Sequence, residues 1–236
     1  MALILSIETG TDICSVALSN DGELMALRES NEGRDHAKKV ALFVDELLKE
    51  TAVQPADLDA IAVGKGPGSY TGLRIGVSFA KGMCYALNIP LISVGSLDAL
   101  VQVAREDFDA GIVDIEDEDW NRATLCPMVD ARRMEVYTQL FNTDGASLSD
   151  VTAEIVTPET FSDVRANGKL VIFGNGAEKC CEVLPDAIYV LVTPSARGIV
   201  ALAEQAFNNS QFEDIAYFEP FYLKDFLVIP SKKKLL

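Results

Sequence analysis

Residues 60–74 read AIAVGKGPGSYTGLR, and the rest of the chain is best interpreted outward from this segment. Its first four residues are apolar and predict a short buried strand. A glycine-rich loop follows over residues 64–72, and the periodic apolar residues after it predict a helix over residues 71–87. The segment therefore predicts a strand, a tight loop and a helix, which is the repeating unit of a sheet covered by helices.

The flanking residues extend this unit into a larger sheet. Strands are typical of short apolar or alternating runs bounded by turn residues, and helices of apolar residues spaced three and four apart. We expect, in order, strands at 2–7, 13–19 and 23–29, a helix at 36–51, a strand at 91–94 and a helix at 97–105. The first hundred residues thus predict an α/β mixed sheet in the order β-β-β-α-β-α-β-α.

The second part of the chain repeats this pattern more loosely. We expect strands at 125–129, 134–141, 151–156 and 169–173, and helices at 158–167, 177–183 and 195–208. The repetition suggests a duplicated domain. The segment 106–119 is acidic at eight of fourteen positions, and a solvated connection is the simplest interpretation of such a run. We therefore predict an N-terminal domain of residues 1–105 and a C-terminal domain of residues 106–236.

The composition excludes several classes of protein. The 236 residues carry 36 Asp and Glu against 20 Lys and Arg, a formal net charge of -16. Because nucleic-acid surfaces are bound through Lys and Arg, this charge argues against direct contact with nucleic acid, and equally against anionic membranes. Five cysteines without a C-x-x-C spacing fit neither a disulfide framework nor a zinc site, so a cytoplasmic protein is expected.

The single histidine limits the chemistry further. His36 is the only histidine, so a site that needs two histidines from one chain is excluded. A zinc peptidase helix needs the second histidine four residues later, where Val40 stands. A hydrolase using Ser69 and His36 stays open as a third alternative, although the G-x-S-x-G motif of such enzymes is missing around Ser69.

The helix after the glycine-rich loop is rich in small residues. Gly72, Gly76 and Gly82 each cost up to about 1 kcal/mol relative to alanine. Small residues at this spacing permit another helix to approach closely. That helix could belong to this chain or to a second subunit. The loop itself could cradle an anion, but a tight strand-to-helix connection is the simpler interpretation.

Four segments together resemble the TsaB (YeaZ) family. They are Ile7-Glu8-Thr9, Arg34-Asp35-His36-Ala37, residues 64–74 and residues 129–137, and the most specific piece is GPGSYTGLR at 66–74. The family belongs to the actin/Hsp70/sugar-kinase superfamily. The resemblance therefore implies an actin-like ATPase (ASKHA) fold, with two β-β-β-α-β-α subdomains whose mixed sheets are flanked by helices around a cleft.

The resemblance also implies a function. It implies a non-catalytic scaffold of the complex that forms N6-threonylcarbamoyladenosine at position 37 of tRNAs reading ANN codons. Such a subunit pairs with TsaD or with itself, recruits the ATPase TsaE, and meets tRNA only through the complex. TsaD-type proteins hold a metal through H-x-x-x-H, and Val40 replaces the second histidine, so neither a metal nor glycoprotease activity is expected. The alternative is a nucleotide-hydrolysing or phosphotransfer enzyme of the same superfamily.

Two sets of site residues follow from the resemblance. The interface with TsaD or a second copy is expected at His36, Val40, Phe43, Leu47, Thr71, Arg74, Gly76, Val77, Ser78 and Lys81. On this basis Gly76→Leu should block pairing and leave the monomer folded. Candidate nucleotide-binding positions are Glu8, Thr9, Gly10, Asp130, Gly174 and Gly176, with Glu8 longer than the usual aspartate. No cofactor is assigned to the chain alone, and ATP or ADP is a candidate ligand of a TsaB–TsaD–TsaE complex.

Overall fold

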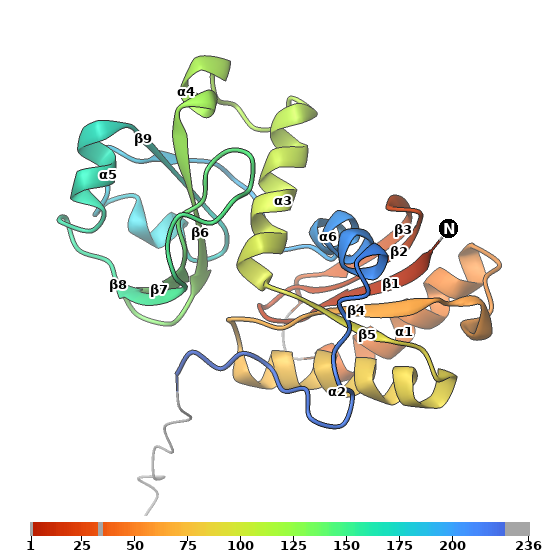
Figure 1. The fold of residues 1–236 in the computed structure, drawn as a ribbon. Coiled ribbons are helices and arrows are strands. Elements are labelled where there is room, and N and C mark those ends of the chain that lie inside the picture. Colours follow the sequence, from red (N-terminus) through yellow and green to blue (C-terminus); the bar gives the residue numbers. More distant parts are fainter. Residues whose placement is uncertain (1, 33–34, 225–236) are drawn as a thin grey trace, which may run out of the picture.

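The computed structural model describes residues 2–32 and 35–224. Arg34 of the resembling segment and the lysine-rich tail at 232–234 lie outside the described residues. Two five-stranded sheets lie side by side, each with helices packed on it (Figure 1). We call them the first unit and the second unit. No helix among the described residues is long and apolar enough to cross a membrane.

The first unit is built on the sheet β3-β2-β1-β4-β5. Its strands are β1 (Leu3–Glu8), β2 (Cys14–Asn20), β3 (Glu23–Ser30), β4 (Ala60–Gly64) and β5 (Leu91–Val94). The strand β2 pairs antiparallel with both β1 and β3. Asp21 and Gly22, which join β2 to β3, adopt the positive φ angles, 52° and 75°, that a tight two-residue hairpin requires. The strands β1, β4 and β5 pair parallel.

Helices cover both faces of the first sheet. On one face lie α1 (His36–Glu50) and α2 (Tyr70–Leu87), whose apolar residues join one core cluster with Leu5, Ile7 and Val63. The other face carries α6 (Arg197–Asn208), packed on Ile4 and Ala62. A single 3-10 turn, η1 (Pro55–Asp57), connects α1 to β4.

The second unit repeats the first in strand order. Its strands are β6 (Ala123–Asp130), β7 (Glu135–Thr138), β8 (Thr152–Ile155), β9 (Lys169–Phe173) and β10 (Ile188–Tyr189), arranged β8-β7-β6-β9-β10. The antiparallel and parallel pairings also match those of the first unit. Thus β6 corresponds to β1 and β9 to β4, and the predicted duplicated α/β fold with two mixed sheets is confirmed.

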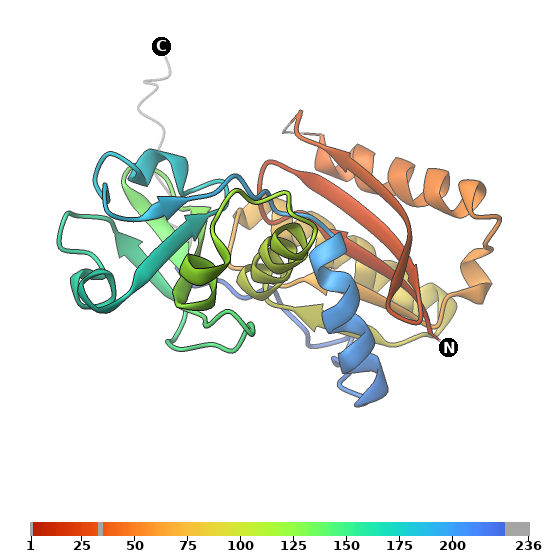
Figure 2. The same cartoon turned by 90° about the horizontal axis from the view of Figure 1, so that it is seen from above.

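The junction between the units differs from the predicted division at residues 105 and 106. That point falls inside α3 (Ser96–Asp109), which lies between the two units beside α6 (Figure 2). Arg197 of α6 holds α3 through Glu106 at 2.9 Å and Asp107 at 2.6 Å. The helix α6 packs on the first sheet although it lies beyond the predicted boundary.

Several local expectations also differ. The acidic segment is partly helical, because α3 continues to Asp109 and α4 spans Asp117–Asn121, where Trp120 stacks on Phe108 with ring centroids 4.2 Å apart. The helix expected at 177–183 is only a 3-10 turn, η2 (Glu178–Cys180). The helix expected at 158–167 is shorter, α5 (Ser162–Asn167).

Candidate functional site

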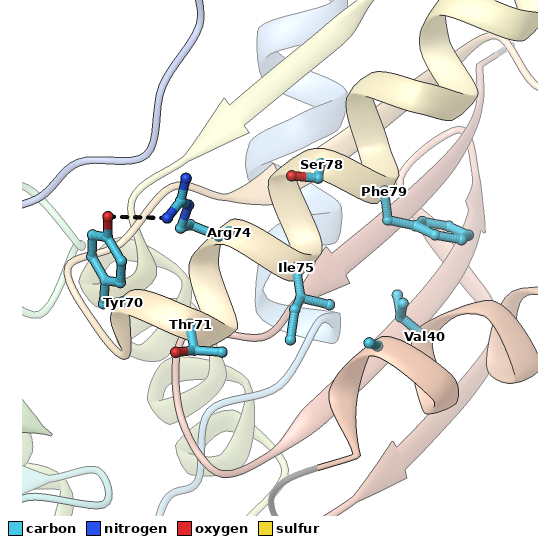
Figure 3. Close-up of a pocket in the computed structure, with 8 residues that line it drawn as sticks. Val40, Tyr70, Thr71, Arg74, Ile75, Ser78 and Phe79 are labelled. Atoms are coloured by element: carbon cyan, nitrogen blue, oxygen red, sulfur yellow. Dashed lines mark hydrogen bonds between the residues drawn. The ribbon is translucent and has the colours of Figure 1, made fainter. Parts of the chain in front are cut away.

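A groove between α1 and α2 forms an apolar hollow on the surface (Figure 3). Its volume is about 560 Å³, and it is lined by Ala37, Val40, Tyr70, Thr71, Arg74, Ile75, Ser78 and Phe79. At one end Arg74 donates a hydrogen bond to the Tyr70 hydroxyl at 3.1 Å and lies 5.2 Å from the ring centroid. The groove thus combines an apolar floor with one cationic end, a surface suited to an apolar helix or loop.

The predicted interface residues fall into two groups. Thr71, Arg74 and Ser78 are exposed on α2, and Phe43 and Lys81 are half-buried. Val40 is buried but lines the floor of the groove. The others, His36, Leu47, Gly76 and Val77, are buried inside the monomer. These four have almost no surface to offer a partner, so their burial argues against the expected direct contact with one. They support the helices from within.

Gly76 and Gly72 face the protein's own interior and not a second subunit. A Cβ at Gly76 would lie 2.2 Å from Oγ1 of Thr9, and one at Gly72 would lie 2.0 Å from the Thr9 carbonyl oxygen. The Thr9 hydroxyl donates to the Gly72 carbonyl at 2.9 Å. The small residues therefore let α2 approach the turn after β1 within the chain. A leucine at position 76 would clash with Thr9, so we now expect Gly76→Leu to destabilise the monomer itself. Gly82, by contrast, meets nothing within 4 Å.

His36 and Ser69 each have a structural partner. The Nε2 atom of His36 lies 2.8 Å from the Thr11 carbonyl oxygen, which ties the start of α1 to the loop after β1. The Ser69 hydroxyl accepts a hydrogen bond from the Gly72 N–H at 3.3 Å and so caps α2. Both side chains serve local structure, which gives no support to a hydrolase built on this pair. Across residues 2–32 and 35–224, no three His, Cys, Asp or Glu side chains are grouped as metal ligands would be.

The turn after β1 is closed by its own carboxylate. Glu8 is 1% exposed, and its Oε1 and Oε2 accept hydrogen bonds from the Gly10 N–H at 2.7 Å and the Ser96 hydroxyl at 2.9 Å. Burial raises the pKa of Glu8, against the opposing effect of these hydrogen bonds. Thr9 is buried as well. The Gly10 N–H, which a phosphate could use, is therefore already occupied by the chain itself.

The corresponding turn after β6 is open. Asp130 is exposed, forms an ion pair with Lys179 of η2, and donates its backbone N–H to Oδ1 of Asn175 at 3.2 Å. A Cβ at Gly176 would lie 2.9 Å from the Asp130 nitrogen, and one at Gly174, where φ is 98°, would lie 2.5 Å from the Met128 carbonyl oxygen. Both glycines are thus required by close backbone packing, whether or not a nucleotide binds there.

Four groove residues were missed by the sequence reasoning: Ala37, Tyr70, Ile75 and Phe79. A usable signal existed on α2, because Thr71, Ile75 and Phe79 are spaced four apart and share one helix face. Lys224, at the end of the described residues, forms an ion pair with Glu135 of β7.

The chain is similar to known proteins over most of its length. Residues 30–228 match the family model described as TsaD, tRNA N6-adenosine threonylcarbamoyltransferase. The chain is 30% identical over 232 residues to the tRNA threonylcarbamoyladenosine biosynthesis protein TsaB of Escherichia coli, covering 94% of each chain. It is 34% identical over 151 residues to TsaB of Bacillus subtilis, covering 64% of this chain and 60% of that one.

A solved structure is similar over nearly the whole chain. YeaZ from Pseudomonas aeruginosa superimposes with a TM-score of 0.74 at 25% sequence identity, covering 94% of this chain and 100% of that one. The duplicated fold, the matching family model and the near-complete coverage of the E. coli relative agree with one another. The chain therefore belongs to the TsaB (YeaZ) family of tRNA threonylcarbamoyladenosine biosynthesis proteins.

Proposed function

We propose that this protein is a cytoplasmic, non-catalytic scaffold subunit in the formation of N6-threonylcarbamoyladenosine at position 37 of tRNA, and that it docks the transferase TsaD through the α1–α2 groove. The carrying observation is the groove itself, an apolar hollow of about 560 Å³ bounded by the exposed α2 residues Thr71, Arg74 and Ser78. Apolar surface of this kind marks interaction sites in soluble proteins.

The relatedness of the two subunits supports this pairing. Residues 30–228 of this chain match the TsaD model, so a TsaD-type partner is expected to carry a similar pair of helices. Two such pairs can pack with the ridges of one in the grooves of the other. The same geometry accommodates a second copy of this chain. Self-pairing and TsaD binding would then compete for one surface, with TsaE joining the TsaD pair.

The net charge and the closed turn after β1 support leaving tRNA contact and nucleotide binding to the partner subunits. A net charge of -16 disfavours direct tRNA contact, so tRNA is met through the complex. Glu8 occupies the Gly10 N–H, which disfavours a phosphate at the first turn. We therefore propose ATP or ADP as a ligand of the assembled complex rather than of this chain alone. ATP turnover by the isolated chain that is lost in Asp130→Ala would instead favour the enzyme alternative.

The docking proposal is tested with a matched pair of variants. Ser78→Arg places a bulky cation at the groove, whereas Ala201→Arg makes the same kind of change on the exposed side of α6, across the first sheet. We expect Ser78→Arg to abolish co-elution with TsaD of the same organism in sizing chromatography, and Ala201→Arg to co-elute normally. Equal co-elution of both variants would overturn the groove assignment. Failure of the unaltered chain to bind folded TsaD would overturn the scaffold function.

A further inference from the structure

The segment after α6 runs from the first unit to the second. Figure 1 shows it leaving α6, passing α2 and ending below the second unit. Along the way it is fixed to the first unit: the Glu213 N–H donates to the Leu91 carbonyl at 2.8 Å, and the Lys81 ammonium donates to the Phe218 carbonyl at 2.8 Å. These contacts bring the chain along the edge of β5 and then beside α2.

The next residues contact the β4–α2 loop and the groove. The Phe221 N–H donates to the Lys65 carbonyl at 2.7 Å. The ring of Tyr222 lies 4.8 Å from that of Tyr70, which lines the groove and receives the Arg74 hydrogen bond. Tyr222 therefore packs against Tyr70, one of the residues that line the groove.

The segment then reaches the second unit. Lys224 forms an ion pair with Glu135 at the start of β7, and its Nζ lies 5.5 Å from the ring centroid of Tyr137 on the same strand. Otherwise the chain passes between the units at α3 and at the return from β10 to α6. The segment is thus a third connection, and it is non-covalent at its far end.

We propose that residues 219–224 act as a strap that restrains the second unit relative to the β4–α2 loop, with Tyr222 and Lys224 as its two anchors. The physical argument is that the described chain crosses between the units at α3 and at the return from β10 to α6, and a contact far from these two crossings has the longest lever arm for restraining one unit relative to the other. Because the Lys224 contacts are partly exposed, they are weak enough to open and close reversibly.

The test measures the separation of the two units in the full chain. Spin labels are placed at Ala56→Cys in the first unit and Asp163→Cys in the second, both exposed, in a Cys181→Ser background, because the other four cysteines are buried. We expect one narrow distance distribution in the chain with an intact strap. Tyr222→Ala and Lys224→Ala should each broaden it, and the double variant should broaden it most. Tyr217→Ala is the matched control, an exposed tyrosine on the same segment.

The distance distributions of the anchor variants and the control decide whether the strap exists. Broadening in both anchor variants and none in Tyr217→Ala supports the strap. An unchanged distribution in the anchor variants, with circular dichroism showing that they are folded, overturns it. Since no partner is present, the result is independent of TsaD binding, and failure of the strap can be told apart from failure of the docking proposal.

Discussion

The Glu8 carboxyl fills the space that a side chain at Gly64 would need: a Cβ at Gly64 would lie 2.2 Å from Oε2 of Glu8. The absence of a side chain at the end of β4 is what lets the Glu8 carboxyl turn inward from the end of β1. There it closes the turn where Gly10 lies. At the equivalent position in the second unit, Asp130 is paired with Lys179 at the surface instead.

The buried Glu8 carboxyl should make stability depend on pH. Because its pKa in the folded state is raised above the ordinary value of 4.5, the folded protein binds more protons than the unfolded chain in this range. The contribution of Glu8 to the free energy of unfolding should therefore fall as the pH rises above 4.5, with a slope of at most about 1.4 kcal/mol per pH unit. Urea unfolding of wild type and Glu8→Gln between pH 4.5 and 8 should show the variant gaining relative stability as the pH rises. Parallel curves would contradict this.

Two glycines of α2 should respond to alanine in opposite directions. Gly76→Ala forces a Cβ against the Thr9 side chain and should cost about 1–3 kcal/mol, as overpacking does. Gly82→Ala meets nothing within 4 Å and should stabilise the protein by up to about 1 kcal/mol through helix propensity. Thermal and urea unfolding measure both. Destabilisation by Gly82→Ala would show that this surface is covered in solution.

The ion pairs between α3 and α6 should contribute to stability. Arg197→Ala removes charged hydrogen bonds to Glu106 and Asp107, and should cost about 1–2 kcal/mol. Lys49→Ala removes an exposed pair with Asp45 on α1, and should change the free energy of unfolding by no more than about 0.5 kcal/mol. Equal changes in the free energy of unfolding for the two variants would mean that the ion pairs between α3 and α6 stabilise the protein no more than an exposed pair does.

Thiol reactivity should distinguish one cysteine from the rest. Cys181 is partly exposed, whereas Cys14, Cys84, Cys126 and Cys180 are buried. Burial also raises the pKa of Cys126 to about 12, which suppresses the reactive thiolate. A thiol reagent such as Ellman's should modify one thiol of the native protein first, and Cys181→Ser should remove that phase. In urea all five should react.

Much of the fold could be predicted because its signals are local. Residues 60–64 are buried on both faces of a sheet and are apolar throughout. The hairpin between β2 and β3 is predictable from two adjacent turn residues, Asp21 and Gly22. The strand β10 has only two residues, Ile188 and Tyr189, which form no pattern. That α6 packs on the first sheet depends on contacts with Ile4 and Ala62, far away in sequence.

The candidate site was predictable only in part. The spacing of Thr71, Arg74 and Ser78 places them on one face of a helix, and periodicity reveals that much. The same spacing cannot distinguish a face that meets a partner from one that meets the chain's own turn. Gly76 belongs to the second kind because Thr9, 67 positions earlier, packs against it. Only the folded chain brings those two residues together.

The unequal helices of the two units would limit pairing through the proposed groove to one partner per molecule. The first unit carries α1 and α2, of 15 and 18 residues, whereas at the equivalent places the second unit has α5, of six, and the three-residue turn η2. In the described part of the chain, only one unit therefore presents a long helical pair. Two copies joined groove to groove share a two-fold axis and use up both grooves, so the assembly closes and cannot grow into a filament.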